Sequence, residues 1–134
     1  MYPQDLKFSR EHHWVKLEGG QARIGLSDFS QSQMGALVYF ELPQVGDKVT
    51  AGEAYGSMES TKAVSDINAP LSGEVVEINE SLEDEPQKVN QDPYGEGWTI
   101  KLKLDDPAQV EGLLEPEAYR QLAEELAAKR KKKG

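Results

Sequence analysis

The segment that decides the fold of this chain reads GDKVTAGEAYGSMESTKAVSDINAPLSG and runs from Gly46 to Gly73. Two runs of strand-like composition, residues 53–60 and 63–68, lie inside it with almost no loop between them. This arrangement predicts a tight β-hairpin with Lys62 at its tip. A lysine in that position is fixed at its backbone and free at its amine, which suits the attachment of a covalent group.

The segments on either side of the hairpin are loosely similar to each other. Residues 45–52 and 69–79 each place a glycine-containing turn before alternating Val or Ile residues. Such a pattern is expected when two small antiparallel sheets fold over one another around the hairpin. We therefore predict a mainly β fold, a flattened barrel-sandwich hybrid of two small antiparallel sheets, with a hairpin unit at about 45–80.

The N-terminal part of the chain predicts two strands and a short helix. Residues 12–18 and 21–26 read as strands joined by a Gly-Gly turn. Residues 27–35 read as a helix that Ser27 caps and Gly35 closes. The run that follows, residues 36–43, is too apolar for a strand with one solvent-facing side, so we expect it to be buried.

The C-terminal part predicts connections, one strand and helices. Residues 80–92 leave room only for a short helical turn near 87–90. Residues 99–104 alternate between polar and apolar side chains, as a final strand would. Helices are expected to begin at Pro107 and at Pro116.

The last of these helices is expected to span about 116–129, because its apolar residues recur three and four positions apart. A basic tail, residues 129–134, follows it. Basic residues suit the C-terminal end of a helix, and such a run is commonly a solvated tail.

Length and composition limit the kinds of protein that this chain can be. Its 134 residues predict a single domain, 1–134. The formal net charge of -9 argues against nucleic acid as a partner. The chain has no cysteine, no signal-like start and no apolar run that could span a bilayer, so we expect a cytoplasmic protein without disulfides or membrane contact.

The adjacent histidines do not predict a metal site or an active site. Strand alternation sends His12 and His13 to opposite faces, so they cannot easily bind one ion. An enzyme that uses either as a base with Asp28 or Asp66 would still lack a recognisable nucleophile or phosphate loop. We therefore expect no metal, no catalytic residue and no enzymatic activity.

The hairpin sequence resembles the lipoyl-lysine site of the glycine cleavage system H protein family. The resemblance rests on ESTKAVSDI at 59–67 and APLSGEVVE at 69–77. Biotin carriers typically place methionine on both sides of the lysine, whereas this chain has Thr61 and Ala63. Further landmarks extend the similarity over nearly the whole chain: His12–Val15, Ser27–Asp28, Glu41–Pro43, Asp92–Trp98 and the C-terminal helix.

The resemblance implies a non-enzymatic swinging-arm carrier with lipoate joined by an amide bond to Lys62. Its arm would pass an aminomethyl group between a pyridoxal-phosphate glycine decarboxylase, a folate-dependent aminomethyltransferase and dihydrolipoyl dehydrogenase. A lipoate ligase or a lipoyl/octanoyl transferase would attach the arm and read Glu59. Ser65 and Asp66 occupy family positions beside the lysine, which implies that they contribute to the cleft that receives the loaded arm.

One departure from the family pattern leaves the cargo open. Where H proteins read His-Glu-Trp, this chain has His13 in place of the glutamate expected to hold the aminomethyl cation. Either His13 is a tolerated surface change and Asp66 or Glu11 holds the cation, or the chain is an H-like lipoate-binding protein. An H-like lipoate-binding protein carries sulfur intermediates in sulfur oxidation, together with a heterodisulfide-reductase-like complex. A further alternative is an interaction module that is never modified.

Overall fold

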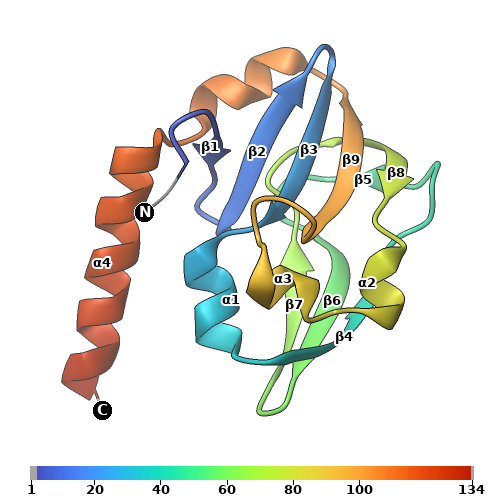
Figure 1. Cartoon of the computed structure of the whole chain (residues 1–134). Helices are drawn as coiled ribbons and strands as arrows, with labels where there is room; N and C mark the ends of the chain where they lie inside the picture. Colours follow the sequence, from blue (N-terminus) through green and yellow to red (C-terminus); the bar gives the residue numbers. More distant parts are fainter. Residues whose placement is uncertain (1–2, 134) are drawn as a thin grey trace.

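The computed structural model describes the backbone of residues 3–133 and the side chains up to residue 129. In this part of the chain, two antiparallel sheets make most of the fold (Figure 1). The larger sheet has the strand order β1-β2-β3-β9-β8-β5 and the smaller one β4-β6-β7. This arrangement confirms the predicted mainly β fold of two antiparallel sheets.

The strands of the larger sheet come from segments that are far apart in the sequence. They are β1 (Lys7–Phe8), β2 (His13–Glu18), β3 (Gln21–Leu26), β5 (Lys48–Val49), β8 (Gly73–Ile78) and β9 (Trp98–Leu104). The smaller sheet is formed by β4 (Leu37–Glu41), β6 (Ala54–Ser60) and β7 (Val64–Asn68). The helical segments are α1 (Asp28–Met34), α2 (Ser81–Asp84), α3 (Lys88–Gln91), η1 (Pro107–Gly112) and α4 (Pro116–Lys133).

Local sequence signals account for most of these elements. Gly19 adopts a φ of 68° in the turn between β2 and β3, a conformation that glycine reaches without strain. The Ser27 side chain accepts a hydrogen bond from Ser30 N at the start of α1, and Gly35 ends that helix with a φ of 83°. Pro107 and Pro116 begin η1 and α4 as predicted. Helix α2 was not predicted.

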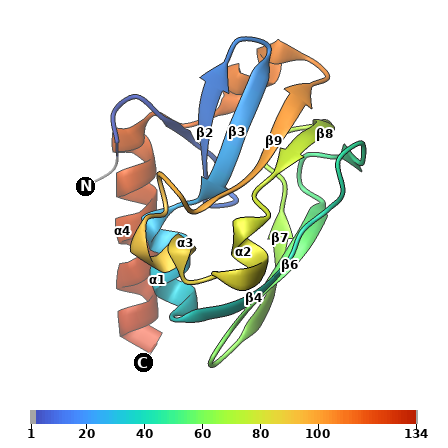
Figure 2. The ribbon, with the colours of Figure 1, turned by 45° about the vertical axis from the view of Figure 1, so that its right-hand side comes forward.

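Two apolar clusters hold the fold together. The first lies between the two sheets and includes Ile24, Phe40 and Ile67. The second joins α4 to the larger sheet, and in it the Tyr119 ring stacks on the Phe8 ring with centroids 4.8 Å apart. Figure 2 shows α4 on the side of the molecule away from the smaller sheet. Burial of these apolar surfaces is the main driving force for the docking of the helix.

Two expectations need correction. The run 36–43 is not buried throughout, because β4 presents Val38 and Tyr39 to solvent with about half of each side chain exposed (51% and 49%). The pairing of β4 with β6 shifts register between Leu37 and Tyr39, and such a bulge places neighbouring residues on the same side. Helix α4 runs to Lys133 and so includes most of the predicted tail, although the side chains of residues 130–133 and the whole of residue 134 lie outside the described part.

Candidate functional site

Lys62 lies in the bend between β6 and β7, at the tip of the hairpin where the sequence predicts it. The bend is held by Ser60, whose N–H donates to Ala63 O over 2.8 Å. The Ser60 hydroxyl accepts hydrogen bonds from the N–H groups of Lys62 (3.2 Å) and Ala63 (3.1 Å). The Lys62 side chain is exposed. The backbone at the tip is therefore fixed while the side chain is accessible to solvent.

A second set of contacts ties the hairpin tip to the connection between α1 and β4. Thr61 N donates to Ala36 O over 3.1 Å. The Lys62 side chain lies over Gly35, since a Cβ built on that glycine would be 3.4 Å from Lys62 Cε. Asn90, in α3, holds the same connection, because its Nδ2 donates to Gly35 O (2.8 Å) and its Oδ1 accepts from Leu37 N (2.9 Å).

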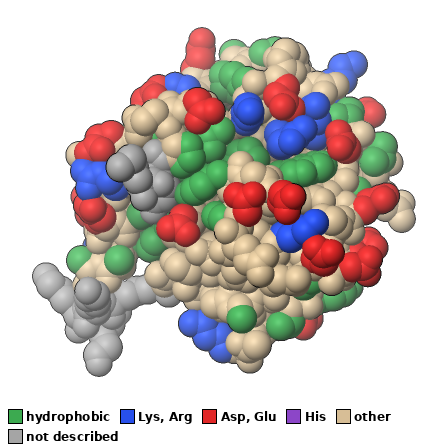
Figure 3. All heavy atoms as spheres, in the orientation of Figure 1, with side chains coloured by type: hydrophobic (Ala, Val, Ile, Leu, Met, Phe, Trp, Pro, Cys, Tyr) green, Lys and Arg blue, Asp and Glu red, His purple; other side chains and the backbone are tan. Residues whose placement is uncertain are grey.

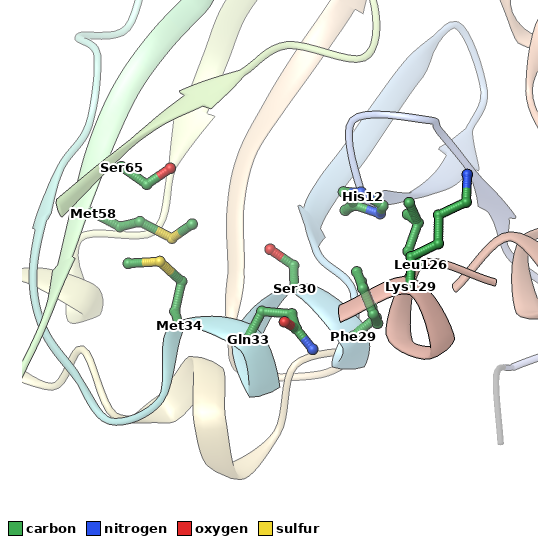
Figure 4. Close-up of a pocket in the computed structure, with 9 residues that line it drawn as sticks. All are labelled: His12, Phe29, Ser30, Gln33, Met34, Met58, Ser65, Leu126 and Lys129. Atoms are coloured by element: carbon green, nitrogen blue, oxygen red, sulfur yellow. The ribbon is translucent and has the colours of Figure 1, made fainter. Parts of the chain in front are cut away.

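A cleft of about 450 Å³ lies beside the hairpin and is shown in Figure 4. Its walls come from α1, from the inner side of β6 and β7, from α4 and from the turn before β2. The lining residues are His12, Phe29, Ser30, Gln33, Met34, Met58, Ser65, Leu126 and Lys129. Met34 directly precedes Gly35, over which the Lys62 side chain lies, so the cleft begins next to the lysine.

The described lining of this cleft consists mostly of apolar and uncharged polar side chains, and His12 and Lys129 lie at one end. Figure 4 shows the thioethers of Met34 and Met58 facing one another near Ser65. His12 adopts a φ of 67°, and its Nδ1 lies 2.8 Å from the Tyr119 hydroxyl. No Asp or Glu is among the described residues that line the cleft. The cleft therefore suits a flexible, uncharged chain with sulfur atoms better than a cation.

His13 points away from the cleft and into the core, with only 1% of its surface exposed. Its Nε2 lies 2.8 Å from the Tyr55 hydroxyl, which lies 2.9 Å from Thr99 Oγ1. Burial is the main cause that lowers the pKa of His13 to about 3, and the neighbouring His12 lowers it further. His13 is therefore neutral at physiological pH, and the alternative in which it is a tolerated surface change is wrong.

The structure brings together only some of the residues that were expected around the arm. Ser65 lines the cleft, whereas Asp66 is exposed and does not line it. Strand alternation explains the difference, because neighbours in β7 point to opposite faces of the sheet. Glu59 is exposed on β6 and is absent from the lining of the cleft. Glu11 lines a separate cavity with Pro70.

Several residues of the site were not expected from the sequence. No role at a site was predicted for Phe29, Met34 or Met58, and Leu126 was expected only among the apolar residues of the C-terminal helix. Only the packing of α1, α4 and the hairpin around one space makes them neighbours. The role of Ser60 in bracing the bend could have been predicted from the local sequence, because a serine two residues before a tight bend often bonds to backbone N–H groups.

The described part of the chain contains no group of three or more His, Asp or Glu side chains that could hold a metal ion. It also contains no helix that is both long and apolar enough to cross a membrane. One ring nitrogen of each histidine has a tyrosine hydroxyl as its partner: Nδ1 of His12 bonds to Tyr119 and Nε2 of His13 bonds to Tyr55.

Together these features define a β domain of two antiparallel sheets that presents an exposed lysine on a braced hairpin beside a cleft. The family model for the glycine cleavage H-protein matches residues 6–126. The chain is 51% identical to the glycine cleavage system H protein of Carboxydothermus hydrogenoformans over 123 residues, which cover 92% of this chain and 95% of the relative. The chain belongs to the glycine cleavage H-protein family.

Other relatives agree with this assignment. The glycine cleavage system H protein of Halalkalibacterium halodurans is 50% identical over 123 residues, with 92% of this chain and 96% of the relative covered. The crystal structure of a glycine cleavage system H protein from Mycobacterium marinum superposes with a TM-score of 0.82 at 35% identity. That superposition covers 90% of this chain and 98% of the other, so the fold is shared over nearly its full length.

Proposed function

We propose that this chain is a lipoyl-lysine carrier of the glycine cleavage system, with lipoate in amide linkage to Lys62. The observation that carries the proposal is the exposed Lys62 side chain, which lies at a braced hairpin tip beside a cleft. When bound, the dithiolane of the lipoyl group supplies a sulfur atom that carries an aminomethyl group. The chain itself is not an enzyme; it holds and positions the arm.

The residues around Lys62 fit such an arm. A lipoyl chain is mostly hydrocarbon with a disulfide at its end, and Phe29, Met34 and Met58 offer it apolar and thioether surface. Ser30, Gln33 and Ser65 add polar groups that can bond to an amide or a solvent molecule. The braced turn keeps the attachment point fixed, so the motion of the arm comes from rotations within the lysine and the lipoyl chain.

A tethered arm replaces free diffusion of its cargo by a high local concentration at each partner. The proposed partners are the glycine decarboxylase, the aminomethyltransferase and the dihydrolipoyl dehydrogenase, and a lipoate ligase or a lipoyl/octanoyl transferase that loads Lys62. We propose Glu59 as a residue that the loading enzyme reads, because it is exposed on the hairpin three residues before the lysine. A cytoplasmic location remains a prediction.

Intact mass spectrometry tests the central proposal. Protein made in cells that have lipoate and a lipoylating enzyme is expected to gain the mass of one lipoyl group, and the Lys62→Arg variant is expected to gain none. The arginine keeps the positive charge and similar bulk but cannot be acylated in the same way. A gain of lipoyl mass that persists in the Lys62→Arg protein would refute the assignment of the site. An unmodified wild-type chain would favour an interaction module.

The cleft supports a second candidate cargo. Its described lining holds His12 and Lys129 and no carboxylate, so it offers no opposite charge to an aminomethyl cation. A sulfur intermediate, passed to a heterodisulfide-reductase-like complex, would need no such charge. The two functions are separated by glycine-dependent exchange of carbon dioxide with the decarboxylase. Activity of the lipoylated protein equal to that of a Halalkalibacterium halodurans H protein would establish the aminomethyl role, and no activity of the lipoylated protein beside that control would favour the sulfur carrier.

A further inference from the structure

The outer face of the smaller sheet presents apolar side chains next to Lys62. Val38, Tyr39 and Val64 are 51%, 49% and 71% exposed. The strand register places Tyr39 opposite Glu59 and Glu59 opposite Val64, so these three residues form one row across β4, β6 and β7. Val64 follows Lys62 by two positions, which places the row at the base of the hairpin tip.

The next exposed row on this face is acidic. It consists of Glu41, Ser57 and Asp66, which are paired in register across the same strands. Ser57 Oγ donates to Glu41 Oε2 over 3.4 Å, in agreement with a shared face. The sequences of β4, β6 and β7 contain no Lys or Arg. The two rows therefore combine an apolar strip with three carboxylates, including that of Glu59, and no basic side chain from the strands.

The larger sheet differs in its charge pattern. Several of its basic side chains lie beside acidic ones, with Lys101 Nζ 3.0 Å and Arg23 Nε 3.6 Å from Glu18 Oε1. Lys48 Nζ likewise lies 3.7 Å from Glu74 Oε1. Figure 3 shows acidic and basic side chains interspersed on the face of the molecule that Figure 1 presents. Unbalanced negative charge beside exposed apolar groups is thus a feature of the smaller sheet.

We propose that the outer face of the smaller sheet, made of the Tyr39–Glu59–Val64 row and the Glu41–Ser57–Asp66 row, docks the enzyme that acylates Lys62. The surface of the enzyme that meets this face is apolar at its centre and basic around it, because charge complementarity guides and orients such encounters. The inference rests on the proposed function of Lys62 as an attachment site. It adds the surface by which the loading enzyme holds the protein.

Two observations favour this occupant. Unmodified Lys62 has no arm, so an enzyme that acylates it must approach within the length of a lysine side chain and contact the surface around it. Met58 and Ser65, which line the cleft, point to the opposite face of the same strands, so a protein on the outer face leaves the cleft open. A second copy of this chain is disfavoured because it would bring carboxylates against carboxylates.

The test uses the purified, unmodified full-length chain with a lipoate–protein ligase, lipoate and ATP, and follows intact mass over time. The double variant Tyr39→Ser/Val64→Ser is expected to lower kcat/KM for loading about tenfold, because apolar anchors dominate such interfaces. The matched control Leu17→Ser/Val45→Ser removes two apolar residues that are 46% and 61% exposed elsewhere. It is expected to be loaded at the wild-type rate. Wild-type kinetics for the Tyr39→Ser/Val64→Ser protein would overturn the proposal.

A competition experiment separates docking from chemistry. The Lys62→Arg protein is expected to inhibit loading of the wild type, and the same protein with Tyr39→Ser/Val64→Ser is expected to inhibit about tenfold less well. A wild-type chain that is never loaded would refute the proposed function itself. Normal loading of Tyr39→Ser/Val64→Ser, with a loss of exchange activity on the decarboxylase, would assign the face to that partner and refute only this inference.

Discussion

The Lys62 side chain lies along the backbone of Gly35, where a Cβ would stand 3.4 Å from Lys62 Cε and 4.0 Å from Nζ. The glycine ends α1 with a φ of 83° and its carbonyl is held by Asn90. The backbone conformation favours a residue without a side chain at this position, whereas a Cβ would only make ordinary van der Waals contact with the lysine. The end of α1 thus lies in contact with the stem of the lysine.

Substitution Gly35→Ala is expected to lower the free energy of unfolding by about 1–2 kcal/mol, because the backbone conformation at this position is strained for any residue with a Cβ. Loading of Lys62 is expected to be unchanged, since the new methyl group would make only ordinary van der Waals contact with the lysine stem. Urea unfolding measures the stability and intact mass measures the loading. Gly20→Ala, where a Cβ would meet nothing within 4 Å, is the control. Equal stability of the Gly35→Ala and Gly20→Ala proteins would contradict this account.

Removal of the Ser60 hydroxyl is expected to loosen the hairpin tip. In Ser60→Ala the N–H groups of Lys62 and Ala63 lose their shared acceptor, which costs about 1 kcal/mol or somewhat more. Amide hydrogen exchange at residues 60–63 should accelerate as a result. Ser32→Ala, at an exposed position of α1, serves as the control. Unchanged exchange at the tip would show that Ser60 does not brace it.

Acid is expected to destabilise the protein through His13. Its pKa in the folded protein is about 3, below the ordinary value of 6.5, so the unfolded chain takes up the proton first as the pH falls. The contribution of His13 to stability is complete above pH 6.5 and is lost progressively between 6.5 and 3. At pH 5 the loss is about 2 kcal/mol.

Urea unfolding at pH 7 and pH 5 measures this effect. The variant His13→Gln keeps an amide that can bond to the Tyr55 hydroxyl but does not titrate, so its stability should vary less with pH than that of the wild type. His12→Gln, at the cleft, is the matched control. A His13→Gln protein that loses as much stability at pH 5 as the wild type would disprove the assignment.

Substitution Glu59→Ala is expected to slow loading of Lys62 with little change in stability, because the side chain is exposed. Its midpoint of urea unfolding should stay within experimental error, while the loading rate falls. Glu53→Ala, an exposed position just before β6, is the control. If Glu59→Ala reduced folding and loading to the same extent, the residue would be structural and would not be a recognition residue.

A carboxylate placed in the cleft is expected to protect an aminomethyl cargo. Ser65→Asp adds a negative charge to a lining that has none among the described residues, and so should stabilise an ammonium group there. The measurement is the rate at which aminomethyl-loaded protein releases formaldehyde on hydrolysis. Ser65→Asn, which has similar shape without the charge, is the control. Equal release rates for the Asp and Asn proteins would show that the cargo does not reside near Ser65.

The sequence by itself determined the local structure of this protein. Alternating apolar residues, the Ser27 and Gly35 caps, the Gly19 turn and the hairpin around Lys62 are encoded within a few residues of where they act, and all are present in the structure. The resemblance of the hairpin sequence to a lipoyl-lysine site likewise identified the family to which the chain belongs. Each of these signals needs only a short stretch of chain.

Only the tertiary structure decided which side chains share a space. Ser65 and Asp66 point to opposite faces of β7, whereas His12 lies in the turn before β2 and His13 is the first residue of that strand. One residue of each pair lines the cleft and the other does not. Alternation predicts that separation but does not identify the buried face. The bulge in β4 and the docking of α4 depend on contacts between distant segments, and these contacts exposed Tyr39 and brought Leu126 to the cleft.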